Sequence, residues 1–237
     1  MARGPGEVGA AATLADIGAA LSASGLIPRG AIFFDGADAP RLASGAPAAA
    51  VVLIGHGGGV FFSRFGAWLA DHPGVADPLD RWSKAVISLV AEALGGEAVF
   101  PSDPPYLPFQ RWAMAAEGLK ASPLGILMHP EFGLWHGYRG AILFGEGGFE
   151  AADCGPPVSA VHACDSCVAK PCLSACPVSA FSSAGFDVAA CRAHLATETG
   201  QTGCMTSGCK ARAACPVGAE YRYGAAQIRF HMAAFAP

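Results

Sequence analysis

The distribution of cysteine limits what this chain can fold into more than any other feature of its sequence. All nine cysteines lie between Cys154 and Cys215, and residues 1–153 contain none. A reducing cytosol disfavours disulfides, and an odd number of cysteines gathered in one part of a chain is typical of metal binding. We therefore expect the second part of the chain to fold around metal.

Eight of the cysteines form two half-motifs, each of which ends in Cys-Pro-Val. The first has the spacing Cys-x2-Cys-x4-Cys-x3-Cys, and three thiolates on such a tight loop can hold three irons of a cube. The cysteine before the proline points away and can reach a second cube. Zinc, which also binds Cys-x2-Cys pairs, is the main alternative. The pattern predicts two 4Fe–4S clusters with the ligands Cys164, Cys167, Cys172, Cys176, Cys191, Cys204, Cys209 and Cys215.

This stretch resembles the bacterial-type two-cluster ferredoxins, in which the fourth cysteine of each motif serves the other cluster. The thirteen-position step from Cys191 to Cys204 is longer than in the compact form and resembles the ferredoxin module of epoxyqueuosine reductases. Cys154 is left over, and we expect a buried or linker residue rather than a ninth ligand. The resemblance implies one cluster on Cys164, Cys167, Cys172 and Cys215 and the other on Cys176, Cys191, Cys204 and Cys209.

Composition excludes several classes of protein. Apolar residues make up 52% of the 237 residues and charged residues 14%, which excludes a disordered chain. The net charge of −4 shows no basic balance, so no DNA partner is expected. The longest apolar run, residues 46–55, is far shorter than the roughly 20 residues that span a bilayer, so no membrane association is expected. Glu7 and Asp16 interrupt any apolar leader, and a cytoplasmic location is expected.

The chain is expected to divide into two domains, 1–150 and 151–237. The first carries nine basic and fourteen acidic residues, whereas the second carries six and five. Glycines and prolines at 147–148 and 155–157 break any regular element between the two.

Apolar periodicity in the first domain predicts an α+β fold. Thr13 begins a capping box, and Asp77 followed by Pro78 is typical of a cap and a helix start. In the second domain we expect helices over 188–197 and 224–235 and cysteine-bearing loop elsewhere. The first domain is expected to hold helices over 14–21, 61–69, 78–94 and 109–119 and strands over 31–34, 50–54, 125–128 and 140–144, the first two of them buried.

One segment of the first domain, residues 128–144, has the pattern strand, polar and aromatic turn, strand. It resembles the CblC-type cobalamin-processing family, in which the matching segment is His-Pro-x-Phe-Gly-Gly-Trp, then Ile-Arg-Gly and an apolar strand. Leu134 replaces the second glycine, and weaker similarity extends the resemblance over residues 48–144. The matching positions are His129, Pro130, Phe132, Gly133, Trp135, Arg139 and Gly140.

The resemblance implies a flavin-nitroreductase-like fold that binds cobalamin in a base-off form and removes its upper ligand reductively. His129 would face the nucleotide tail or the corrin, and Arg139 would meet a phosphate or an amide edge. Phe132 and Trp135 would pack on the macrocycle, with Gly133 in the turn between them. Flavin is the alternative ligand because the same fold also holds flavin. Dimers are common among such folds, so a homodimer is among the expected states.

A CblC-like domain followed by two 4Fe–4S clusters is also the layout of epoxyqueuosine reductases and reductive dehalogenases. Cysteine-ligated clusters reach strongly negative potentials, which suits the reduction of cobalt to cobalt(I). By resemblance to the epoxyqueuosine reductases, Asp103 is the candidate general acid, against the simpler interpretation as a turn residue. Gln110-Arg111 stands where that family has Glu-Arg, which weakens a tRNA-modifying interpretation.

A glycine-rich loop, residues 55–59, follows a predicted strand. It has neither the Gly-x-Gly-x-x-Gly spacing nor the Lys-Ser/Thr of a P-loop. A flexible strand-to-helix turn is therefore the simpler interpretation, and contact with a flavin or corrin phosphate is the alternative.

These patterns together predict an iron–sulfur protein that passes low-potential electrons to a bound corrinoid. The alternatives are a ferredoxin-type electron carrier whose acidic first domain only docks a partner, and an epoxyqueuosine-reductase-like enzyme. Each interpretation requires a redox partner, either a ferredoxin or flavodoxin or a reductase.

Overall fold

The computed structural model describes residues 10–36, 38–150, 162–182 and 185–236. Its first part is a mixed α+β arrangement on a four-stranded antiparallel sheet in the order β1-β2-β6-β3. The strands of this sheet are β1 (Ile27–Phe33), β2 (Ala50–Gly57), β3 (Glu97–Val99) and β6 (His136–Phe144). The helices are α1 (Leu14–Leu21), α2 (Val60–Asp71), α3 (Pro78–Ala93) and α4 (Phe109–Glu117). A separate hairpin consists of β4 (Lys120–Ala121) and β5 (Leu127–Met128).

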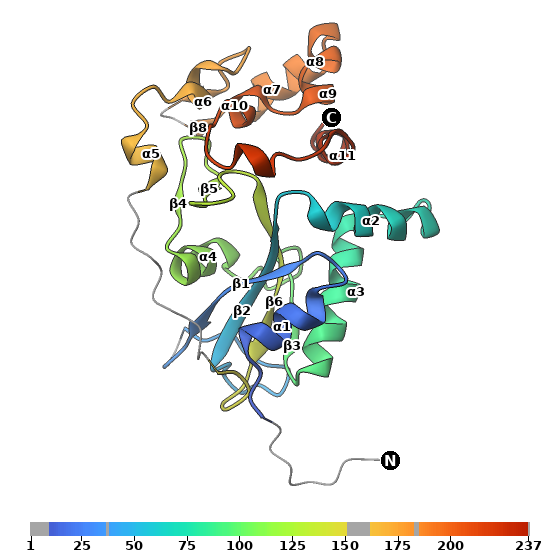
Figure 1. Cartoon of the computed structure of the whole chain (residues 1–237), viewed down its shortest axis with the longest axis vertical. Coiled ribbons are helices and arrows are strands. Elements are labelled where there is room, and N and C mark those ends of the chain that lie inside the picture. Colours follow the sequence, from blue (N-terminus) through green and yellow to red (C-terminus); the bar gives the residue numbers. More distant parts are fainter. Residues whose placement is uncertain (1–9, 37, 151–161, 183–184, 237) are drawn as a thin grey trace.

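The two faces of the central strand β2 are covered by different helices (Figure 1). Val52 and Ile54 point into a core shared with α1, α2 and α3. Val51 and Leu53 point into a second core shared with α4. This alternation is the period of two that a β-strand imposes, and all four side chains are fully buried. The apolar run 50–54 therefore specifies the middle layer of three.

The predicted start of α1 is confirmed in detail. The Asp16 carboxylate accepts a bond of 2.9 Å from the Thr13 backbone N–H, and the Thr13 hydroxyl accepts one of 3.2 Å from the Asp16 N–H. Helix α3 also begins at Pro78 as predicted, but the expected cap is wrong. Asp77 has a φ of 47°, and its side chain makes no capping hydrogen bond to the helix.

Two strand predictions for the first part need correction. Only Leu127–Met128 of the predicted strand 125–128 is extended, and it pairs with Lys120–Ala121 outside the main sheet. The predicted strand 31–34 belongs to β1, which starts earlier and lies at the sheet edge, so Phe33 is 51% exposed rather than buried.

The second part consists of short elements at one end of the sheet (Figure 1). Helices α7 (Val188–Leu195) and α11 (Ala225–Phe235) confirm the two predicted there. The expectation of loop elsewhere was wrong, because the cysteine-bearing chain forms further single-turn helices and a hairpin. These are α5 (Ala163–Ser166), α6 (Pro171–Ser174), α8 (Glu198–Thr202), α9 (Cys204–Ser207), α10 (Lys210–Ala213), the 3-10 helix Ala219–Tyr221, β7 (Phe181–Ser182) and β8 (Gly185–Phe186).

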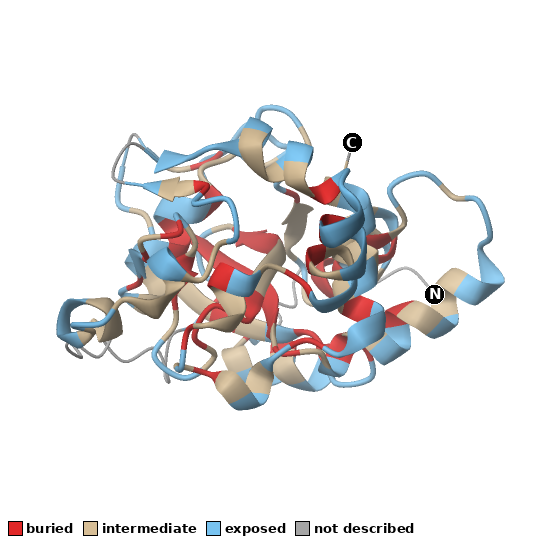
Figure 2. Ribbon diagram, turned by 90° about the horizontal axis from the view of Figure 1, so that it is seen from above, coloured by how far each residue is buried: buried red, intermediate tan, exposed pale blue. Residues whose placement is uncertain are grey.

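The two parts share packing interfaces. On α11, the Phe230 ring lies 5.1 Å from Phe65 and 5.8 Å from Phe62 of α2. A further apolar cluster joins residues 124–134 of the first part to Ala211 and Cys215 of the second. Seen from above, buried residues lie in the middle of the molecule and exposed residues along the outer helices (Figure 2). Among the described residues, no helix has the length and hydropathy that crossing a bilayer requires.

A buried arginine, Arg29, connects strands of the main sheet through hydrogen bonds. Arg29 is only 2% exposed, and its Nε and Nη2 atoms donate to both carboxylate oxygens of Glu117 at 2.7 and 2.8 Å. Its Nη1 donates to the His56 carbonyl at 3.0 Å, and its Nη2 lies 3.3 Å from Nδ1 of His136. Tyr138 completes the network with a hydrogen bond to Glu117. Since a buried charge needs partners, these residues fix one another across β1, β2, α4 and β6.

Two histidines of this region are held neutral. Burial, and after it the Arg29 guanidinium, lowers the pKa of His136 to about 3. Burial lowers the pKa of His56 to about 3 against the pull of its bond to the Gly58 carbonyl. The Nε2 atom of His136 donates to the Leu127 carbonyl at 2.8 Å, which leaves Nδ1 to accept from Arg29.

These histidines predict a pH dependence of stability. The pKa of each rises from about 3 in the folded chain toward 6.5 on unfolding, so the unfolded chain binds more protons between those values. Stability is therefore fully present above pH 6.5 and falls as the pH decreases, by up to about 1.4 kcal/mol per pH unit for each histidine. His136→Gln keeps an amide for both hydrogen bonds but cannot titrate. We expect the midpoint of anaerobic thermal unfolding to fall less between pH 7 and pH 5 in this variant, and an equal fall would contradict the assignment.

Candidate functional site

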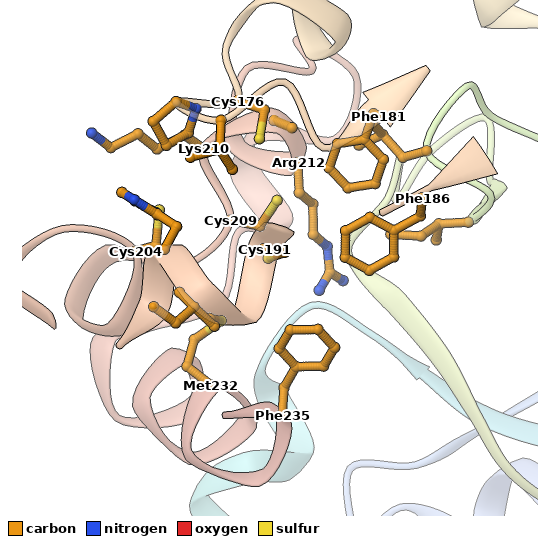
Figure 3. Close-up of a pocket in the computed structure, with 17 residues that line it drawn as sticks. Cys176, Phe181, Phe186, Cys191, Cys204, Cys209, Lys210, Arg212, Met232 and Phe235 are labelled. Atoms are coloured by element: carbon orange, nitrogen blue, oxygen red, sulfur yellow. The ribbon is translucent and has the colours of Figure 1, made fainter. Parts of the chain in front are cut away.

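The eight described cysteines are free thiols that line two separate cavities. The first cavity has a volume of about 290 Å³ and the second about 260 Å³. Cys154 lies outside the described residues. The first cavity is lined by Cys164, Cys167, Cys172 and Cys215. The second cavity is lined by Cys176, Cys191, Cys204 and Cys209, all of which are labelled in Figure 3.

The electrostatic neighbours of Cys164 and Cys191 follow the same division. Burial raises the pKa of Cys164, and the further sulfurs that raise it are Cys215, Cys172 and Cys167. Burial likewise raises the pKa of Cys191, followed by Cys209, Cys176 and Cys204. Thiolates gathered in this way repel one another. A bound cation would remove that repulsion, and metal ligation requires the deprotonated form.

Short helices hold these sulfurs and direct backbone N–H groups toward them. Cys209 precedes α10, and the N–H groups of Arg212 and Ala211 oppose the effect of burial on its pKa. The Ala180 N–H donates to Sγ of Cys176 at 3.3 Å. Such bonds stabilise a thiolate and tune the potential of an iron–sulfur centre.

Within the described ranges, no three His, Cys, Asp or Glu side chains converge closely enough to hold a single metal ion. A 4Fe–4S cluster does not require that convergence, because each thiolate ligates a different iron at a corner of the cube. Four thiols around each cavity are the donor set that such a cluster takes. The residues therefore fit two clusters, and their ligation stays a prediction.

Phe132, predicted to pack on a macrocycle, is partly buried and is contacted by three other side chains. The His129 ring stacks on it at 4.4 Å, the Tyr221 ring meets it edge-on at 4.8 Å, and the Arg29 guanidinium lies 5.3 Å from its centre. His129 itself is half-buried, and its Nδ1 accepts bonds from the N–H groups of Glu131 and Phe132 at 3.1 and 3.0 Å. Burial, then Arg29, lowers the pKa of His129. The neutral ring is therefore used to shape the turn.

Trp135, the second predicted macrocycle contact, is 4% exposed and covered by the second part of the chain. The Arg212 guanidinium lies 4.5 Å from the Trp135 ring and 4.6 Å from the Tyr223 ring. Its Nε and Nη2 donate to the Leu134 carbonyl at 3.1 and 2.5 Å. The buried Nε1 atom of Trp135 has no hydrogen-bond partner among the described residues. The indole therefore serves the interface, with its polar atom unused.

The remaining predicted residues are engaged elsewhere. Arg139 forms an ion pair with Asp80, and its Nε donates to the Ser83 hydroxyl at 3.1 Å. Asp103 forms an ion pair of 2.5 Å with Lys84, and both side chains are partly exposed. The structure thus brings the cysteines together in two sets of four, whereas Asp103 and Arg139 each pair with helix α3. A corrinoid facing Phe132 and Trp135 would have to displace groups that now cover them.

Glycines let the two parts approach closely. Gly133 has a φ of 57°, and a Cβ there would lie 2.0 Å from the Val217 carbonyl oxygen, two residues after Cys215. In the glycine-rich loop, the Gly58 N–H donates to the Trp135 carbonyl at 2.7 Å. A Cβ at Gly59 would lie 2.7 Å from Oε1 of Gln227 on α11. The loop therefore packs closely against the second part of the chain.

Sequence reasoning missed the residues that make this interface. Tyr223, Gln227 and His231 recur at intervals of four, which places them on one side of α11 and its N-terminal flank. Gln227 is 1% exposed, and neither of its amide atoms has a hydrogen-bond partner among the described residues. Burial lowers the pKa of His231 to about 4. The spacing of four could have predicted that these three residues share one face of a helix. No sequence pattern distinguishes Arg212 from the other basic residues near the cysteines.

Comparison with known proteins yields no family model that matches the chain and no significant match among curated proteins.

The contact at Gly133 predicts how two glycine substitutions differ. Gly125 also has a positive φ, 76°, but a Cβ there meets no atom within 4 Å. Gly125→Ala should cost only the left-handed strain, about 1–2 kcal/mol. Gly133→Ala should cost a further ~1–3 kcal/mol, because the Val217 backbone must move. Anaerobic thermal unfolding measures both losses, and losses of equal size would show that the turn does not seat the Cys215 segment.

Proposed function

We propose that this chain is an electron-transfer protein that holds two 4Fe–4S clusters, one in each cavity. The observation that carries the proposal is the division of eight thiols into two sets of four, each around its own cavity. The division crosses the sequence order, because Cys215 joins the first set and Cys176 the second. A chance cluster of cysteines has no reason to produce it.

When bound, such clusters accept and release single electrons at potentials from about −700 to +450 mV. The residues around them suit that use. One apolar cluster contributes to the walls of both cavities, with Leu134 lining the first and Ala211 the second. Excluding water there lowers the reorganisation that a change of charge requires, while backbone N–H groups such as that of Ala180 stabilise the sulfurs.

The proposal extends to the fold families that the sequence resembles. An antiparallel sheet covered by helices on both faces supports a nitroreductase-like first part. The last cysteine of each half-motif lines the cavity of the other half-motif: Cys176 lines the second cavity and Cys215 the first. This exchange supports a ferredoxin-like second part. Free thiols at the eight described cysteines favour a reducing compartment, the cytoplasm.

Iron analysis of paired variants tests the proposal. Anaerobically purified protein should contain about eight irons and eight sulfides. Cys164→Ala with Cys215→Ala removes two ligands of one cavity and should leave about four irons, as should Cys191→Ala with Cys209→Ala. The matched control, Cys164→Ala with Cys191→Ala, damages both cavities and should leave almost none.

Two outcomes would overturn the proposal. Zinc in place of iron would replace electron transfer by a structural role. Half the iron retained in the mixed control would show that the sulfurs are shared differently between the sites.

A corrinoid acceptor on residues 129–139 is the second candidate function. The contact of Gly133 with the segment after Cys215 favours it, because electrons leaving the first cavity would reach this turn directly. The protein groups that cover Phe132 and Trp135 would have to move aside to admit the ligand.

Titration with hydroxocobalamin tests this second candidate. A corrinoid site predicts a saturable shift of the cobalamin spectrum that His129→Ala weakens by about tenfold, the loss of one good contact. His72→Ala, an exposed histidine stacked on Trp68 of α2, is the matched control and should bind as the parent does. Absence of a spectral shift with the parent protein would rule out the corrinoid site and leave only the two-cluster electron carrier as a proposed function.

A further inference from the structure

We infer that the mouth of the second cavity is the docking surface for an acidic one-electron carrier protein. The inference rests on the proposed function and adds the place and the charge of the partner. It stands on three features of the described residues: exposed aromatic rings, a one-sided distribution of charge, and the contrast with the first cavity.

Three phenyl rings form the apolar part of this mouth. Phe181 and Phe186 of the β7–β8 hairpin stack at 4.6 Å with an angle of 11°, and Phe235 of α11 lies 6.2 Å from Phe186. Figure 3 shows these rings on one side of the cavity with cysteine sulfurs on the other. Phe186 is 39% exposed, Val178 of the same cavity lining is 37% exposed, and Val188, two positions along the chain from Phe186, is 41% exposed. Apolar side chains that reach from solvent to the sulfurs offer a short, dry contact for electron transfer.

The charges around this mouth are mostly positive. Lys210 and Arg212 line the cavity, and no carboxylate is among the described residues that line it. On the rim, the Arg192 guanidinium lies 5.3 Å from the Phe235 ring, and its Nε donates to the Phe235 carbonyl at 3.2 Å. Asp187, which follows Phe186, is the acidic residue nearest to this ring in sequence. Its carboxylate accepts a bond from the Ala190 N–H at the start of α7, where the helix dipole offsets part of its charge. Arg212 is half-buried against Trp135 and Tyr223, whereas Lys210 and Arg192 are exposed. These two exposed cations therefore attract a partner of negative charge.

The first cavity lacks this combination. No aromatic residue is among the described residues that line it, and its Lys170 donates to the Cys164 carbonyl at 2.8 Å. Its lining also includes Met128 and Leu134, which belong to the first part of the chain. That first part carries nine basic and fourteen acidic residues and would repel an acidic partner. Electrons would thus enter at the second cavity and leave by way of the first.

The experiment uses a reduced plant-type [2Fe–2S] ferredoxin, an acidic carrier of low potential, as the probe. Each encounter removes one electron from that ferredoxin and adds one to this protein, with no atom or proton transferred. Stopped-flow mixing with the iron-loaded full chain gives the second-order rate constant. At low ionic strength, Lys210→Glu should reduce it by about tenfold or more, and the difference should vanish near 1 M salt, where charges are screened within ~3 Å.

Two further variants make the test specific. Phe186→Ser removes an exposed ring without changing charge and should slow transfer at every ionic strength. Arg111→Glu, an exposed residue of α4 on the first part, is the matched charge-reversal control and should leave the rate constant within twofold of the parent. Basic cytochrome c, used as an oxidant of the reduced protein, should react faster with Lys210→Glu than with the parent.

The possible failures are distinguishable. Absence of iron in the parent protein would remove the proposed function itself. Full iron and an unchanged visible spectrum in all variants, with equal effects of Lys210→Glu and Arg111→Glu on the rate, would overturn the docking surface alone. Weakened binding of oxidised ferredoxin to Lys210→Glu, measured by calorimetry, gives a readout that does not depend on electron transfer.

Discussion

Gathering thiols in apolar cavities is the constraint on which the second part of the molecule depends. Its helices other than α7 and α11 have three to five residues, too few to be stable alone, and its hairpin pairs two residues with two. Burial and mutual repulsion raise the pKa of thiols such as Cys164 and Cys191. If the sulfurs hold clusters as proposed, this part of the chain would gain stability from them, since metal-binding free energy then becomes folding free energy.

The second constraint is the packing between the two parts of the chain. Arg212 reaches from the wall of the second cavity to the Leu134 carbonyl and lies against Trp135 and Tyr223. Phe230 of α11 packs on α2 nearby. One cation thus contacts both a cavity and the turn that precedes β6. Within the described ranges, Trp135 Nε1 and the Gln227 amide at this interface have no protein hydrogen-bond partner, and buried polar atoms of this kind are commonly paired with ordered water.

Local patterns predicted what local physics determines. The alternation along 50–54 and the capping box at Thr13 each act within a few residues, and each corresponds to an observed element. The Arg29 network was not predictable, because Glu117 and His136 lie 88 and 107 positions away in sequence. Asp77 was misjudged because its backbone adopts a left-handed conformation that composition does not reveal. The division of cysteines between cavities came from a resemblance, not from spacing.

The turn that resembles a corrinoid-binding segment shows how one sequence pattern suits two uses. His129 caps the turn through two backbone N–H groups, and Gly133 allows the Val217 carbonyl to approach. Both features place the turn against the segment that follows Cys215, whether or not a ligand binds. A redox centre in the first cavity would therefore sit beside the turn for a purely structural reason. The same proximity would place an acceptor bound at the turn within reach of electrons from the first cavity, so a contact between the two parts and the proposed acceptor site would share one surface.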